Sequence, residues 1–151
     1  MSYEIADIED GILTTLAASA MNAYCRVFET WGGSVEDLIA RKALLTPACY
    51  VGLGGLDFED GAGGTQNASA LFSVIVFARN LRGEAAGRRG GPGPTEVGAY
   101  EMIGHARAAL HASDLGLRID RCHVLSVRRL DVGKNYAAYA LDVALEWLIQ
   151  D

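Results

Sequence analysis

One stretch of the sequence, residues 70–78, predicts a strand that is apolar on both faces. Its nine residues are apolar except for Ser73, and β-branched and aromatic residues fill its centre. A strand without a polar face must lie deep in a core. We therefore expect this stretch to anchor a sheet.

A basic, glycine-rich segment follows the strand almost at once. Residues 81–94 contain five Gly, two Pro and three Arg. Such a composition buries too little surface to order itself, so we predict a flexible loop. The loop is either an idle insertion or a segment that becomes ordered on a partner. The candidate partner-binding residues are Arg79, Arg82, Arg88 and Arg89.

The length and charge of the chain limit its class. Its 151 residues, half of them apolar, predict a single domain over residues 1–151 with a substantial core. The net charge of −6 disfavours a general partner of nucleic acid or of anionic membranes. Residues 1–75 carry ten acidic and three basic side chains, whereas residues 76–151 carry nine and ten. This polarity would suit head-to-tail self-assembly, although an even scatter of charges over the folded surface is the simpler interpretation.

The cysteines and the N-terminus indicate a cytosolic protein. Cys25, Cys49 and Cys122 are widely spaced among apolar neighbours, which is typical of buried, reduced thiols. No basic region followed by an apolar run opens the sequence, and no apolar window reaches the roughly 18 residues of a membrane span. We expect neither a cleaved export signal nor a membrane-bound form.

The hydrophobic pattern predicts three helices interspersed among five strands. Ile5, Ile8, Ile12 and Leu16 recur at helical spacing. Ser34 would cap a short helix, and a longer helix is expected from Thr95 to a stop near Gly116. The predicted strands cover residues 24–31, 48–53, 67–79, 118–130 and 136–149.

These elements predict an α+β fold. We expect one domain with a mostly antiparallel sheet of four to five strands, on which an N-terminal helix and a second long helix pack. The last predicted strand alternates clearly, so that one of its faces is core and the other carries small residues with Asp142 and Glu146.

No constellation of residues predicts catalysis, a metal or a cofactor. His105 and His111 are six residues apart on the predicted helix and point away from each other. Cys122 and His123 are adjacent on a strand and point to opposite faces. No nucleophile elbow occurs in the sequence.

Three other patterns are better explained as turns or loops. The glycines of residues 52–55 and 61–64 lack the Lys-Ser/Thr ending of a phosphate loop. The acidic residues at 57, 59 and 60 do not fit the calcium-binding spacing. The tract at 87–91 lacks the aromatic residues of arginine-glycine RNA-binding repeats.

Several segments together resemble a Mu-like prophage family that belongs with tail proteins. They are Glu-Thr-Trp-Gly-Gly at 29–33, the entry Leu-Leu-Thr-Pro-Ala-Cys-Tyr-Val at 44–51, Ala-Arg-Asn-Leu-Arg-Gly-Glu at 78–84 and Gly-Ala-Tyr-Glu-Met-Ile at 98–103. The resemblance covers nearly the whole chain, and within phage tails the chain is similar to the tail terminator.

The resemblance implies a homo-oligomeric ring, of six copies, in the neck of the virion tail, assembled in the bacterial cytoplasm. Such a ring caps the head-proximal end of the tail tube, stops its polymerisation and docks to the head-tail connector proteins. A contractile tail would add the sheath as a partner. From charge polarity we expect ring neighbours to meet through Arg128, Arg129, Asp142 and Glu146.

Two alternatives stay open. A head-completion or connector protein would use a similar small fold in a ring of different size. A small cytosolic ligand-binding domain or enzyme would instead be built around His105, Cys122 or His123, and would show one deep pocket with convergent polar groups.

Overall fold

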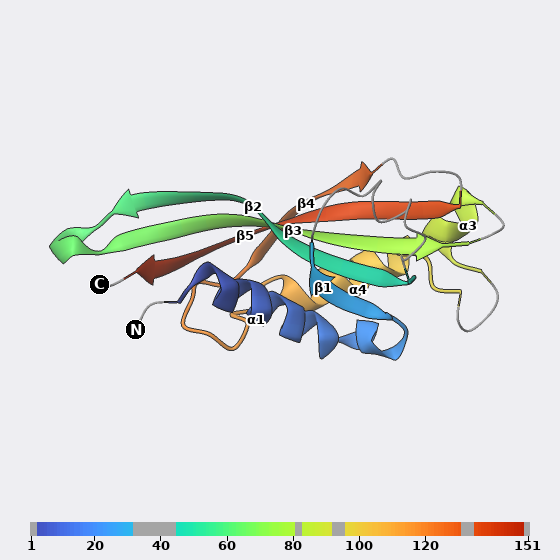
Figure 1. Cartoon of the computed structure of the whole chain (residues 1–151), viewed down its shortest axis with the longest axis horizontal. Coiled ribbons are helices and arrows are strands. Elements are labelled where there is room, and N and C mark those ends of the chain that lie inside the picture. The colour runs from blue at the N-terminus through green and yellow to red at the C-terminus, as the bar shows by residue number, and fades with distance from the viewer. Residues whose placement is uncertain (1–2, 32–44, 81–82, 92–95, 131–134, 150–151) are drawn as a thin grey trace.

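The computed structural model describes residues 3–31, 45–80, 83–91, 96–130 and 135–149. Within these ranges one twisted five-stranded sheet has the strand order β1-β2-β3-β5-β4 (Figure 1). Neighbouring strands are antiparallel except β1 and β2, which are parallel. The strands are β1 (Val27–Thr30), β2 (Ala48–Asp60), β3 (Gln66–Arg79), β4 (His123–Leu130) and β5 (Tyr136–Ile149). The helices are α1 (Ile5–Ala17), η1 (Ala20–Ala23), η2 (Ala62–Gly64), α3 (Glu84–Arg89) and α4 (Ala99–Leu110). The predicted α+β architecture is confirmed.

The apolar stretch at 70–78 forms the centre of the sheet, as predicted. It lies in β3, between β2 and β5. Phe72 and Val74 are buried in the larger core on one face, whereas Ile75 and Phe77 are buried in a smaller core on the other. Each such aromatic or aliphatic side chain contributes about 1.5–3 kcal/mol when fully buried, so β3 holds the two cores together.

Helix α1 packs on the larger core. Ile8, Ile12 and Leu16 are each fully buried at intervals of four residues, which places them on one face of the helix. The Glu4 amide donates to Asp7 Oδ2 at 2.8 Å, in a reciprocal capping arrangement that begins the helix. Helix α4 lies on the same side of the sheet, so the two helices cover one face together (Figure 1).

The opposite face has a smaller cover near β1. Trp31 stacks on Phe77 with 6.1 Å between ring centroids, and Tyr50 meets both rings edge-on at 5.7 and 5.8 Å. The predicted helix that begins at Ser34 lies outside the described residues. Strand β1 confirms the middle of the strand predicted at 24–31.

The β2–β3 hairpin is longer than predicted. The sequence predicts that the first strand ends at residue 53, but β2 continues to Asp60, because the register shifts at Gly54 while pairing with β3 continues. The tip has Gly63 and Gly64 at φ of 67° and 78°, where glycine is favoured. As a result, the hairpin extends past the helices as an arm (Figure 1).

Helix α4 is shorter than predicted. Its predicted start, Thr95, lies outside the described residues. The helix ends at Leu110 rather than near Gly116, because His111 has ψ of 127° and Ala112 has φ of 63°, neither of which continues a helix. The loop that follows, from His111 to Cys122, returns to the end of α4.

Strand β4 begins at His123, later than the predicted residue 118. The Cys122 amide donates to the Ser113 carbonyl at 2.7 Å, and the Cys122 carbonyl accepts from the Ala112 amide at 2.8 Å. These bonds hold the segment just before β4 against the end of α4, so that it does not join the sheet. By contrast, β5 has the predicted bounds.

Residues 84–89 form a helix that the sequence pattern does not predict. We expected no regular structure at 81–94, but α3 packs against β3, β5 and α4. The helix fits there because Gly87 is buried, and a Cβ added to it would lie 3.4 Å from the Ala137 side chain. Residues 81–82 and 92–95 lie outside the described ranges. Whether the segment is flexible in an isolated subunit stays a prediction.

Candidate assembly surfaces

The predicted interface residues Arg128 and Asp142 bond to each other within one chain. Arg128 Nε donates to Asp142 Oδ2, and its Nη2 donates to Oδ1, both at 3.2 Å. The Ser126 hydroxyl also donates to Oδ2 at 2.8 Å. This two-pronged geometry is the stronger form of an arginine–carboxylate pair. Contact of these residues with a second copy stays a prediction.

The pair perturbs the titration of Asp142. Burial of the carboxyl would by itself raise its pKa, but hydrogen bonds from Arg128 and Ser126, together with the arginine charge, outweigh burial and lower the pKa. Asp142 is therefore ionised under ordinary conditions and holds Arg128 in place.

Arg129 is placed on the other face of the sheet. In the β4–β5 register it is opposite Tyr139, whereas Arg128 is opposite Ala140, and successive residues of a strand point to opposite faces. The structure therefore does not gather the two predicted arginines into one patch.

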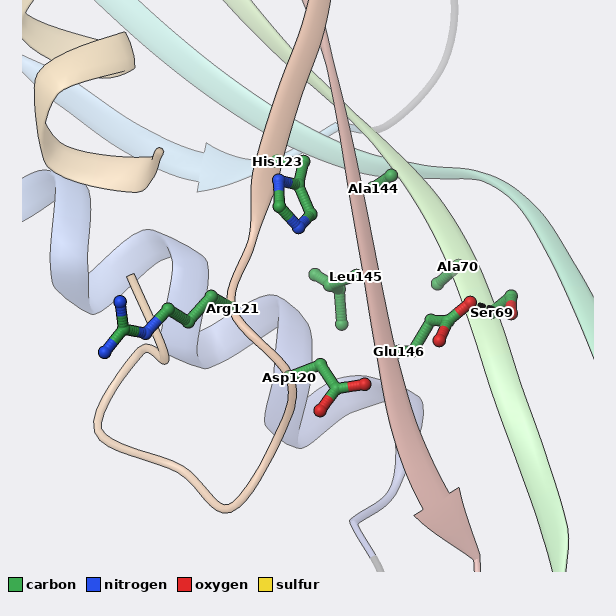
Figure 2. A pocket seen from close by; sticks show the side chains of 8 residues that line it. All are labelled: Ser69, Ala70, Asp120, Arg121, His123, Ala144, Leu145 and Glu146. Carbon is green, nitrogen blue, oxygen red and sulfur yellow. Dashed lines mark hydrogen bonds between the residues drawn. The ribbon is translucent and has the colours of Figure 1, made fainter. Parts of the chain in front are cut away.

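Glu146 lies beside a small open cavity rather than in a cluster with Asp142. Its Oε1 accepts a bond from the Ser69 hydroxyl at 3.0 Å, and the cavity next to it has a volume of about 290 Å³. Figure 2 shows Arg121 extending away from this pair, while Asp120 comes from the loop before β4. The polar side chains come from separate elements and do not converge on one point.

The outer side of β4 is a sheet edge. Among the described residues no strand pairs with it, although Val124 N donates to His111 Nδ1 at 3.3 Å near its start. Leu125 and Val127 are 63% and 42% exposed on this strand. Unpaired backbone groups next to exposed apolar side chains are typical of a strand that accepts another strand.

The other free edge belongs to the arm. Strand β1 pairs with β2 only along residues 48–51, so residues 53–60, here called the distal segment of β2, have no outer strand partner within the described chain. Asp57, Glu59 and Asp60 are exposed on it, and Phe58 is 54% exposed. The sequence predicts turn residues at these positions, because its pattern does not show that β2 continues beyond residue 53.

The candidate partner-binding arginines are divided between two elements. The Arg79 guanidinium lies over the Tyr136 ring, 5.5 Å from its centroid. Arg88 and Arg89 lie in the last turn of α3, where the negative end of the helix dipole stabilises cations. Arg89 is exposed and Arg88 is half-buried. Arg82 lies outside the described residues.

The histidines and cysteines do not assemble a reactive site. His105 Nδ1 lies 2.8 Å from the Tyr24 hydroxyl, which ties α4 to η1. His111 and His123 approach with 5.9 Å between ring centroids, a proximity that their separation in sequence gave no means to predict. Burial raises the pKa of the Cys122 thiol to about 11, with a contribution from Asp114, so the thiol stays protonated. Among the described residues no three His, Cys, Asp or Glu side chains are placed to share a metal ion.

The fold and these surfaces define an α+β domain that exposes open strand edges and the charged side chains described above. Over residues 4–150 the sequence matches the family described as Bacteriophage Mu, Gp37, and the chain belongs to this family. It is therefore a phage structural protein. No curated protein matches the chain. None of the helices in the described ranges is long and apolar enough to cross a membrane.

Proposed function

We propose that this protein is the tail terminator of a Mu-like phage or prophage. Six copies form a ring at the head-proximal end of the tail tube, in the neck of the virion. The ring stops tube polymerisation and presents its other side to the head-tail connector. Surface complementarity performs this task, and no catalytic step is required.

The free edges of the sheet are the observation that supports this proposal most directly. A growing tube repeats one heterologous contact, and a terminator must copy one side of that contact while presenting a different surface on the other. A subunit for this purpose needs separate surfaces for ring neighbours, tube and connector. The β4 edge, the arm and the end of α3 are exposed surfaces on separate parts of the domain, and such contacts can be divided among them.

The length of the tails tests the proposal. A phage or prophage that lacks this gene is induced, and its tails are measured by electron microscopy. We expect tails of variable and excessive length without heads, because nothing stops the tube. Complementation with the wild-type gene should restore one length.

The test also separates the proposal from its nearest alternative. Headless tails of normal, uniform length would overturn the terminator role and support a head-completion or connector protein. Image averaging of the neck supplies an independent check, because a ring that does not match the symmetry of the tube cannot copy its contact.

A further inference from the structure

We propose that β4 of one subunit pairs with the distal segment of β2 of a second copy, and that this head-to-tail strand pairing forms the ring interface. The inference rests on the proposed ring and specifies its contact. It identifies two surfaces, the outer edge of β4 and residues 53–60, and their occupant is another copy of this chain.

The two edges are comparable in length and open. Strand β4 has eight residues, and the distal segment of β2 also covers eight, residues 53–60. Their side chains are mostly exposed along both segments. A long, open edge leaves backbone donors and acceptors available, and a partner strand satisfies them.

The strand directions are compatible with a head-to-tail ring. Because β2, β3, β5 and β4 alternate in direction across the sheet, β2 and β4 run in opposite directions within one subunit. A copy related by rotation about an axis to which the strands are tilted, as in a barrel, keeps these directions. Its β2 therefore lies antiparallel to the first subunit's β4, and repetition of the same step closes a ring.

Charge selects this pairing over the symmetrical ones. Strand β4 carries Arg128 and Arg129, whereas the distal segment of β2 carries Asp57, Glu59 and Asp60. A two-fold β4–β4 contact would bring the arginines of both copies together, and a β2–β2 contact would bring the carboxylates together. Like charges directly opposite each other across strands are destabilising, and opposite charges are stabilising.

The faces of the two strands fix a register. Val127 is opposite Leu141 on the helix-covered face, and Phe58 is opposite Ala68 on that same face. Pairing Phe58 with Val127 joins two exposed apolar side chains, and it places Asp57 opposite Arg128. A slip of one residue would move every side chain to the wrong face.

This register also staggers neighbouring subunits. Val127 is level with Val51 through β5 and β3, so the neighbour shifts along the strands by about six residues, roughly 20 Å. Closing a sheet around an axis requires strands that are tilted and staggered in this way.

Arg128 can join both carboxylates. Asp142 accepts hydrogen bonds from Nε and Nη2 of Arg128. The guanidinium has five N–H donors in all, so Nη1 can donate to Asp57 of the neighbour. The contact inside the chain positions the guanidinium before a neighbour arrives. The pairing of Arg128 with Asp142 thus prepares the edge of β4 for the second copy.

A disulfide trap tests the register. Phe58→Cys and Val127→Cys are introduced together in the full chain, which is oxidised mildly in solution and also within purified tails. In one chain these positions lie three strand spacings apart across the sheet, about 14 Å, and about six residues apart along it. This is too far for a disulfide, so any bond between them joins two copies. We expect a ladder of covalent multimers on a non-reducing gel, ending at the size of the ring.

The single variants and the wild type are the matched controls. The wild type measures the contribution of its own three cysteines. Dimers from Val127→Cys alone would overturn the proposal in favour of two-fold β4–β4 contact. Absence of the ladder in tails that contain the double variant would overturn it as well, while normal tail length in those particles would leave the terminator proposal intact.

Charge reversal gives a second, independent readout. Asp57→Lys with Glu59→Lys should shift the protein to smaller oligomers or abolish its incorporation into tails. The control pair Asp10→Lys with Glu101→Lys changes the net charge equally on exposed positions of α1 and α4, and should leave assembly unchanged. Equal behaviour of the two pairs would overturn the charge argument.

Discussion

The backbone of Gly98 lies directly against the backbone of Gly90, where the entry to α4 meets the end of α3. A Cβ built on Gly98 would collide with the Gly90 amide nitrogen and would lie 2.5 Å from the Arg88 carbonyl oxygen. The Gly91 amide donates to the Glu96 carbonyl at 2.9 Å beside this contact. Two glycines therefore make the tight join between these helices.

Gly98→Ala should destabilise the domain. The atoms that a methyl group would meet belong to the backbone, so α3 must move away, at a cost of about 1–3 kcal/mol. Gly104→Ala is the matched control, because it lies in α4 with no atom within 4 Å of the added Cβ. It should stabilise the domain by about 0.5–1 kcal/mol. Urea unfolding measures both, and equal effects would contradict the close contact.

Tyr24→Phe should weaken the attachment of α4 to η1. The change removes the 2.8 Å bond between the Tyr24 hydroxyl and His105 Nδ1 while keeping the stacked ring. We expect a loss of about 0.5–1.5 kcal/mol in the free energy of unfolding. A double-mutant cycle with His105→Ala isolates this contact, and strictly additive losses would show that the bond contributes nothing.

Alkali should destabilise the protein partly through Cys122. The ordinary pKa of this thiol is 9.0 and its folded value is about 11, raised first by burial and then by Asp114. The folded state therefore holds the proton more tightly. The associated stability is complete below pH 9 and is lost as the pH rises to 11. Cys122→Ala should lose less stability than the wild type across that range. Parallel pH profiles of the two proteins would refute this assignment.

The strands and the first helix were predictable because their patterns repeat. Strand β5 alternates over its whole length, and α1 buries every fourth residue against the sheet. The limits of β2 were not predictable in the same way. Its glycines resemble a turn locally, and only the pairing of a long partner strand, β3, makes them part of an edge.

Helix α3 could not be predicted for a related reason. Its Gly87, together with the glycines and prolines after it, indicates a loop, but burial of Gly87 against Ala137 allows a short helix to pack closely on β5. Likewise, the proximity of Arg128 and Asp142 follows from strand register, which the alternation of each strand alone does not determine.

Asp142→Lys should destabilise the folded subunit, whereas Glu146→Lys should leave its stability nearly unchanged. Reversal at 142 puts a cation against Arg128, but the Glu146 side chain is exposed and, within the described residues, bonds only Ser69. The lowered pKa of Asp142 makes its contribution present above about pH 4 and lost in stronger acid, so Asp142→Asn should flatten the acid limb of stability. Thermal unfolding from pH 2 to 7 checks this, and an unchanged acid limb would contradict it.

Arg89→Glu should impair tail assembly without unfolding the subunit. Arg89 is exposed at the end of α3, where its charge is available to carboxylates of the tube or connector, and its reversal removes no buried contact. Arg107→Glu, exposed in the last turn of α4, is the control for the loss of a helix-terminal cation. Circular dichroism verifies folding, and counts of complete virions in complemented lysates measure assembly. We expect at least a tenfold greater loss with Arg89→Glu than with Arg107→Glu, a difference of about 1.4 kcal/mol in binding. Equal virion counts would mean that the basic segment is an idle insertion, because its only exposed arginine on α3 would then have no partner in the tail.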